Sequence, residues 1–246
     1  MTSATNASDV LWELVPSPWG INSGSVGAST ITYSGAGSVV MNVNYSSLNP
    51  SNAGVNGYPF IFYGGDQWGD QVGGQPPLFP AQLSATQALN LDVSYALKGT
   101  LGGNSDVLFD EWLIPSDSYT GGSGGAMEVE ILPYCNFAYG CEPCPVLKTF
   151  AEPVVVNGAS TVMSFAENAC TTGPGGDVLF SPTTPADGYA SAEIQFNLLD
   201  FLNEAANTAG LANWWVAGLE FGTEFGDASA LNYSLTITKF QISQMN

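Results

Sequence analysis

The chain has 246 residues, enough for one large all-β domain or two small ones and for a self-sufficient apolar core. It contains three basic residues, all lysine, against 22 acidic ones and no histidine, so its formal net charge is −19. Because binding to phosphates needs cations, we expect no nucleic acid as a partner. No apolar run is long enough to cross a membrane, so we also expect no membrane span.

The chain reads as one domain over residues 11–246, preceded by a flexible, polar end over residues 1–10. Short runs of strand-like sequence follow one another at the spacing of a sandwich or barrel, and Asn-Gly and glycine-rich segments between them favour turns. The predicted strands are 28–33, 38–45, 58–63, 89–97, 106–114, 126–135, 153–156, 161–166, 178–182, 214–225 and 232–243.

Residues 190–206 carry the single helical pattern. Ile194, Leu198 and Leu202 recur at four-residue steps, and Gly210 suits the helix end. One amphipathic helix among many strands predicts an all-β fold: a jelly-roll sandwich of two antiparallel sheets with one packed α-helix and a cleft on the other face.

Two predicted strands place carboxylates on one face. Side chains alternate along a strand, so Glu220 and Glu224 share a face with Gly222. Glu128 and Glu130 share a face of another strand in the same way. Glutamates on a sheet are usually just solvated, but charges are scarce in this chain and no base lies near either stretch. We therefore interpret them as a site, with glycine leaving room for a ligand.

Four cysteines, Cys135, Cys141, Cys144 and Cys170, lie within one third of the chain. Their spacing lacks the paired pattern of a zinc ribbon, and no thioredoxin-like pattern surrounds Cys141 and Cys144, so we predict two disulfides without choosing among the three connectivities. Disulfides indicate an oxidising compartment, and we expect an extracellular protein, secreted or tethered to a surface. Asn6, Asn44 and Asn232 head N-x-S sequons, which agree with secretion.

The shortage of bases suggests adaptation to an acidic medium. At about pH 2 to 3 most carboxylates are protonated. So few lysines would then leave little repulsion between like charges.

Four segments, in order, resemble glycoside hydrolase family 12, the small endo-β-1,4-glucanases and xyloglucanases. They are Trp19-Gly20; Gly57-Tyr-Pro-Phe-Ile-Phe-Tyr-Gly64 with Trp68-Gly69 and Phe79-Pro80 after it; Phe109-Asp-Glu-Trp-Leu113; and Leu219-Glu-Phe-Gly-Thr-Glu-Phe225. The predicted helix also falls where the family has its one helix. The resemblance runs from residue 11 to the end of the chain.

The resemblance implies hydrolysis of β-1,4-glucan with retention of configuration, by two carboxyls about 5–5.5 Å apart. Glu224 matches the family's acid/base, and Asp110 matches the residue that hydrogen-bonds the nucleophile. The nucleophile motif fits in two registers, beginning at Glu130 or at Glu128; we choose Glu130, because it keeps a bulky residue and an aromatic at the positions that follow. No metal or organic cofactor is implied.

Trp19, Tyr58, Tyr63 and Trp68 are the predicted sugar-stacking residues, although a buried core position is an equally good interpretation of each. The chain departs from the family at Glu220, where the family has Gln, and at Pro133, which lacks a donor and should lie at an edge or bulge. The cysteine-rich loop 135–144 has no counterpart in the family that we can place.

The predicted function is that of a monomeric endo-β-1,4-glucanase acting on β-glucan polysaccharide. One alternative is a xylanase resembling glycoside hydrolase family 11, which would cut xylan better than glucan. Another is a carbohydrate-binding jelly roll without catalysis, which would need the aromatic cleft but not a pair of carboxyls.

Overall fold

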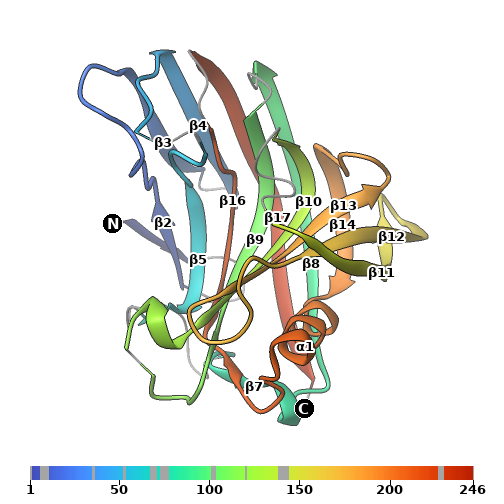
Figure 1. The fold of residues 1–246 in the computed structure, drawn as a ribbon. Coiled ribbons are helices and arrows are strands. Elements are labelled where there is room, and N and C mark those ends of the chain that lie inside the picture. The colour runs from blue at the N-terminus through green and yellow to red at the C-terminus, as the bar shows by residue number, and fades with distance from the viewer. Residues whose placement is uncertain are drawn as a thin grey trace.

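The computed structural model describes residues 2–5, 11–34, 37–51, 54–66, 71–72, 78–100, 104–119, 121–137, 144–226 and 230–245. Two curved layers of strands pack face to face, as Figure 1 shows, and the predicted jelly-roll class is confirmed. The single helix of the described residues, α1 (Leu198–Ala209), lies at the same end of the sandwich as the C-terminus.

The first layer carries the carboxylates and is called the cleft layer below. Its strands, in hydrogen-bonded order, are β1 (Thr2–Thr5), β2 (Leu11–Val15), β5 (Phe60–Gly65), β16 (Gly218–Gly222), β9 (Asn104–Ile114), β10 (Met127–Phe137), β13 (Asp177–Thr184), β12 (Ala159–Asn168) and β11 (Val146–Val156). All these pairs are antiparallel except β10 with β13, which is parallel.

The outer layer consists of β3 (Val26–Ser34), β4 (Ser38–Ser47), β17 (Leu231–Met245), β8 (Ala88–Thr100) and β14 (Ser191–Asn197). Val155 and Val156 at the end of β11 pair with β14, so hydrogen bonding continues from one layer into the other. The smaller elements are β6 (Gln71–Val72), β7 (Ala81–Gln82), β15 (Trp215–Val216), and the 3-10 turns η1 (Leu83–Ala85) and η2 (Ser123–Gly125).

The core between the layers is apolar and rich in stacked aromatic rings. Phe221 of β16 stacks on Phe109 of β9 with ring centroids 4.4 Å apart, and it meets Tyr95 of the outer layer edge to face at 5.7 Å. Such pairs add about 0.5–1.5 kcal/mol each beyond the apolar area that they bury. Phe221 and Phe109 alternate with the cleft residues of their strands, so this packing fixes which side chains face outward.

The prediction of a helix over residues 190–206 is wrong for its first half, which forms β14. Ala192, Ile194 and Phe196 are buried there at every second position, and the strand pairs with β8. The helix starts only after Asn197, whose side chain accepts a hydrogen bond from the Leu199 N–H and caps it. Gly210 ends the helix in a left-handed conformation, φ 75°, as predicted.

Three further predictions concern local structure. The expected flexible end is not free over Thr2–Thr5, because these residues pair with β2. Pro133 lies at a bulge, since the register of β10 against β9 shifts between Ile131 and Tyr134. Of the cysteines, Cys144 and Cys170 form a disulfide and Cys135 is also disulfide-bonded, while Cys141 lies outside the described residues.

Candidate active site

A row of carboxyls crosses the cleft layer on its outward face. Asp110 of β9 lies opposite Glu130 of β10 on one side and opposite Glu220 of β16 on the other. Residues directly opposite on antiparallel strands have Cβ atoms about 4.5–5.5 Å apart. Three carboxyls on three adjacent strands are therefore close neighbours, and Asp110, the middle one, is only 6% exposed.

Glu128 lies one step further along β10, on the same face as Glu130. Its partners are Trp112 of β9 and Asp177 of β13, and these residues line a hollow of about 240 Å³ together with Thr171, Gly175 and Gly176. Glu224 lies at the opposite end of this face, because Phe225, the next residue, bridges to Ser105 of β9. Glu130 is therefore closer to Glu224 along the ladder than Glu128 is.

Glu224 is held in place through the backbone on both sides. Its own N–H donates to Asp106 Oδ1 at 3.0 Å, and its carbonyl accepts a hydrogen bond from the Tyr233 hydroxyl at 3.2 Å. The preceding Thr223 donates its hydroxyl to the Asp106 carbonyl at 2.5 Å. The following Phe225 is fully buried and donates its N–H to the Gly57 carbonyl. Such a frame leaves little freedom for the backbone that carries the carboxyl.

The protonation of these groups is strongly perturbed. Burial, and then the charges of Glu128, Glu220 and Glu130, raise the pKa of Asp110 well above its usual range. Burial, followed by the charges of Asp106 and Glu130, likewise raises the pKa of Glu224, and burial is also the largest cause of the raised pKa of Glu130. Neighbouring carboxyls that share a poorly solvated site cannot all ionise together.

No lysine of the described residues forms an ion pair with these crowded carboxyls. Lys148 pairs with Glu167 and Glu204 beside α1, and Lys239 pairs with Asp92 and Glu193 on the outer layer. The third lysine, Lys98, lines a hollow on the outer layer. Since the chain has no other basic side chain, no cation from a side chain offsets the charge of the cleft carboxyls.

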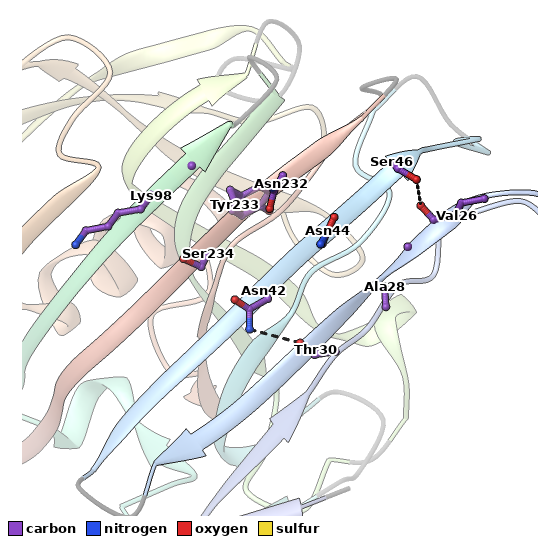
Figure 2. Close-up of a pocket in the computed structure, with 12 residues that line it drawn as sticks. Val26, Ala28, Thr30, Asn42, Asn44, Ser46, Lys98, Asn232, Tyr233 and Ser234 are labelled. Atoms are coloured by element: carbon purple, nitrogen blue, oxygen red, sulfur yellow. Dashed lines mark hydrogen bonds between the residues drawn. The ribbon is translucent and has the colours of Figure 1, made fainter.

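That outer hollow, shown in Figure 2, has a volume of about 740 Å³ and a neutral polar lining apart from Lys98. Asn44 and Asn232, which head two of the sequons, lie there side by side as partners on β4 and β17. Among the described residues, no carboxyl lines this hollow. The carboxylate face of the cleft layer is the candidate active site.

The structure places three of the four predicted stacking residues in different environments. Tyr58 is at the site, where the charges of Asp110 and Glu220 act on it. Its buried hydroxyl has no hydrogen-bond partner within the described ranges, and its ring stacks on Phe60 at 4.7 Å. Trp19 is 57% exposed. Tyr63 is not available for a sugar, because it is 2% exposed and packs in the core, edge to face with Phe79. Trp68 lies outside the described residues.

Sequence reasoning missed three features of the site. Phe62 and Trp112 lie on the carboxylate face, opposite Glu220 and Glu128 respectively. The alternation along β5 and β9 could have found both. Asp106 was not selected either, and its contact with Glu224 joins residues 118 positions apart, which no local pattern reveals.

The glycines of β16 make room for neighbouring protein atoms and not for a ligand. A Cβ at Gly222 would lie 2.8 Å from the Tyr58 ring and 2.2 Å from the Pro59 carbonyl oxygen. One at Gly218 would lie 2.4 Å from the Gly65 carbonyl oxygen. The expectation that glycine leaves room for a ligand is therefore wrong at these positions: the space is filled by β5 and the segment before it.

Within the described ranges no group of three or more His, Cys, Asp or Glu residues could hold a metal ion, and no helix is long and apolar enough to cross a membrane. No known family model matches the sequence, and no curated protein matches it. Solved structures do match it over almost its whole length.

The native family 12 xyloglucanase from Bacillus licheniformis superposes with a TM-score of 0.70 at 21% identity, covering 99% of this chain and 100% of the other. The endoglucanase Cel12A from Rhodothermus marinus gives 0.66 at 15% identity, over 99% of this chain and 96% of its own. The chain has the family 12 glycoside hydrolase fold. The Humicola grisea Cel12A catalytic domain, at 13% identity and a TM-score of 0.65 over 99% of both chains, shows how far sequences diverge within this family 12 fold.

Proposed function

We propose that the protein is a retaining endo-β-1,4-glucanase in which Glu130 is the nucleophile and Glu224 the acid/base. The observation that carries this proposal is the placement of two partly buried glutamates on either side of β9, Glu130 on β10 and Glu224 just after β16, on one face of a family 12 fold. Retaining glycosidases need two such carboxyls, one to attack and one to protonate the leaving group.

In the first step the Glu224 carboxyl gives its proton to the glycosidic oxygen while a Glu130 oxygen attacks the anomeric carbon and the glycosidic bond breaks. In the second step Glu224, now a carboxylate, takes a proton from water, which attacks the same carbon and releases Glu130. Asp110 lies opposite Glu130, and burial is the largest cause of its raised pKa; in its protonated form it can donate a hydrogen bond to the ionised nucleophile.

The choice of Glu130 over Glu128 rests on position and charge. Glu130 faces Asp110, whereas Glu128 faces Trp112 and Asp177. The charge of Glu130 also raises the pKa of Glu224 more than that of Glu128 does. Of the two candidates, Glu130 is therefore the one whose charge acts more strongly on Glu224.

The substrate class is a β-glucan, bound by the partly exposed Phe60 ring, which stacks on Tyr58, and by polar groups of the cleft. The matched structures include both a xyloglucanase and endoglucanases, so both substrates belong in the test. The disulfide between Cys144 and Cys170 supports an oxidising, extracellular location. The raised carboxyl pKa values support activity in acid.

The test is reducing-sugar release from barley β-glucan, xyloglucan and xylan between about pH 2 and about pH 8. Wild type, Glu130→Gln, Glu224→Gln and Glu128→Gln are compared, with the anomer of the first product followed by NMR. Glu130→Gln and Glu224→Gln should each lose at least ~10³-fold in kcat. Glu128→Gln should remain active. If Glu128→Gln is the inactive variant, the nucleophile is Glu128.

Three other outcomes would reject the function itself. Release of the inverted anomer would rule out the double displacement. Binding to glucan without hydrolysis would make this a carbohydrate-binding domain, and faster cleavage of xylan than of glucan would make it a xylanase.

A further inference from the structure

Asp106 is a buried carboxyl next to the proposed acid/base, and no step of the mechanism above uses it. It lies on β9 and is 1% exposed. Its Oδ1 accepts the Glu224 N–H at 3.0 Å and its backbone carbonyl accepts the Thr223 hydroxyl, so it holds the segment that carries Glu224. The two side chains also hydrogen-bond to each other, with Glu224 donating to Asp106.

The surroundings of this pair contain acids and phenols. The charges that act on Asp106, on Glu224 or on their neighbours belong to carboxyl and tyrosine side chains. The carboxyls are Glu128 and Glu130 of β10, Asp110 and Glu111 of β9, Glu220 of β16, Asp66, Asp177 and Asp187. The tyrosines are Tyr134 of β10, Tyr233 of β17 and Tyr58. All three lysines are engaged elsewhere or line the outer hollow. A negative charge on this pair is therefore not offset by a cation.

Proton transfer from Glu224 to the substrate changes the charge of the Asp106–Glu224 pair. Once Glu224 has given its proton to the leaving oxygen, it is a carboxylate in contact with Asp106. If Asp106 is ionised, two adjacent negative charges remain in a poorly solvated place, which is unfavourable. If Asp106 is protonated, its O–H can turn to donate to the new carboxylate, and only one charge is created.

We propose that Asp106 is a positioning residue that must carry its own proton for Glu224 to act as the general acid. The proposal rests on the proposed role of Glu224. The Asp106 proton is not transferred to the substrate: it stays on Asp106 and shifts its hydrogen bond to Glu224 during the step. When water later returns a proton to Glu224, the original arrangement is restored.

This role predicts what limits activity as the pH rises. Burial raises the pKa of Asp106 to about 6, although the hydrogen bonds from Glu224 act in the opposite direction. Burial and then the charge of Asp106 also raise the pKa of Glu224 well above its usual range. Activity should then fall as the pair loses the first of its two protons.

The experiment measures kcat/KM against pH for wild type and Asp106→Asn. Asparagine can still accept the Glu224 N–H through its oxygen, and its amide donates to the Glu224 carboxylate at any pH. The alkaline limb of the variant's kcat/KM profile should move to higher pH by about one unit or more. An alkaline limb that stays in place or moves downward would overturn the proposal.

Two controls separate this role from a structural one. Asp117→Asn removes the same charge from an exposed position after β9 and should leave the alkaline limb where it is. Asp106→Ala removes the donor as well, so kcat should fall by about 10²-fold at every pH. If Asp106→Ala folds and keeps full kcat, the proposal is wrong.

A titration without substrate distinguishes failure here from failure of the proposed function. In wild type labelled with ¹³C at carboxyl groups, Asp106 and Glu224 should respond to each other's ionisation in two coupled steps. This holds even if no glucan is cleaved. Independent titration of Asp106 at an ordinary pKa of about 4 would overturn the proposal regardless of activity.

Discussion

Asp110 lies directly opposite Glu130 across the β9–β10 ladder, and Glu220 lies opposite Asp110 on its other side. One Asp110 oxygen is buried and has no hydrogen-bond partner among the described residues. A protonated carboxyl in this position can donate a hydrogen bond to Glu130, the proposed nucleophile, and separates it from Glu220. In the proposed mechanism, Asp110 supports the charge of Glu130 as long as it keeps its proton.

This relationship predicts different effects for two substitutions at one position. Asp110→Asn keeps a donor toward Glu130 and should lower kcat about 10-fold, whereas Asp110→Ala removes it and should lower kcat by about 10²-fold. Steady-state kinetics on β-glucan at the optimal pH provide the measurement. Equal losses in both variants would mean that the hydrogen bond to the nucleophile is not what Asp110 contributes.

A second prediction concerns Glu111, which points into the core from β9. It is 0% exposed, it lies opposite Val129, and neither of its carboxyl oxygens has a hydrogen-bond partner in the part of the chain that the structure describes. An unpaired buried polar group costs about 1–3 kcal/mol. Glu111→Leu should therefore raise the free energy of unfolding by about that amount at neutral pH.

Glu111→Gln is the matched comparison for this site, since it keeps an unpaired polar group and should bring no gain in acid. Chemical denaturation at about pH 4 and about pH 7 measures both variants. A Glu111→Leu protein that is less stable than wild type at both pH values would show that the carboxyl has a structural role.

The pH dependence of the protein's stability follows from the direction of the pKa shifts of its buried carboxyls. Burial and then the charge of Asp200 raise the pKa of Glu152 to about 8, and burial followed by the charge of Asp177 raises that of Glu128 to about 7. Both pKa values exceed the unfolded value of about 4.3. At pH values between the unfolded and the folded pKa, the folded protein therefore holds more protons than the unfolded protein does. Their contribution is complete below about pH 4 and is lost as the pH rises toward about 8.

The midpoint of thermal unfolding should accordingly be highest in acid and fall steadily between about pH 4 and about pH 8. Glu152→Gln, which does not titrate, should flatten the upper part of this decline. Asp117→Asn, an exposed change of the same charge, should not. A midpoint that rises with pH over this range would contradict both the pKa directions and the hypothesis of acid adaptation.

Gly57 is predicted to be essential for the position of Glu224. A Cβ at this residue would lie 2.3 Å from the Phe225 ring, next to the proposed acid/base. Gly57→Ala should thus displace Phe225, destabilise the fold by about 2 kcal/mol or more and reduce kcat. Gly54→Ala is a suitable control in the same segment, because nothing lies within 4 Å of its Cβ position. A Gly57→Ala protein with wild-type stability and kcat would refute this prediction.

Much of the fold was predictable because its determinants are local. Alternation along Met127–Ile131 and Leu219–Phe225 separates core residues from carboxylates, and the structure keeps that separation. The absence of a donor at Pro133 similarly predicted the bulge of β10. The pattern failed over residues 190–206, where an alternating strand and a helix meet at Asn197 and their apolar positions combine into one apparent helical stripe.

The sequence by itself determined that Glu128, Glu130, Glu220 and Glu224 lie on the accessible faces of their strands, since side-chain alternation is a property of the single strand. Only the tertiary structure decided which of them meet. Glu128 and Glu130 share a face, so the pairing of β10 with β9 was needed to place Asp110 opposite Glu130. Packing likewise filled the space beside Gly222 with Tyr58 and brought Asp106 to Glu224, because such contacts depend on which distant strands become neighbours.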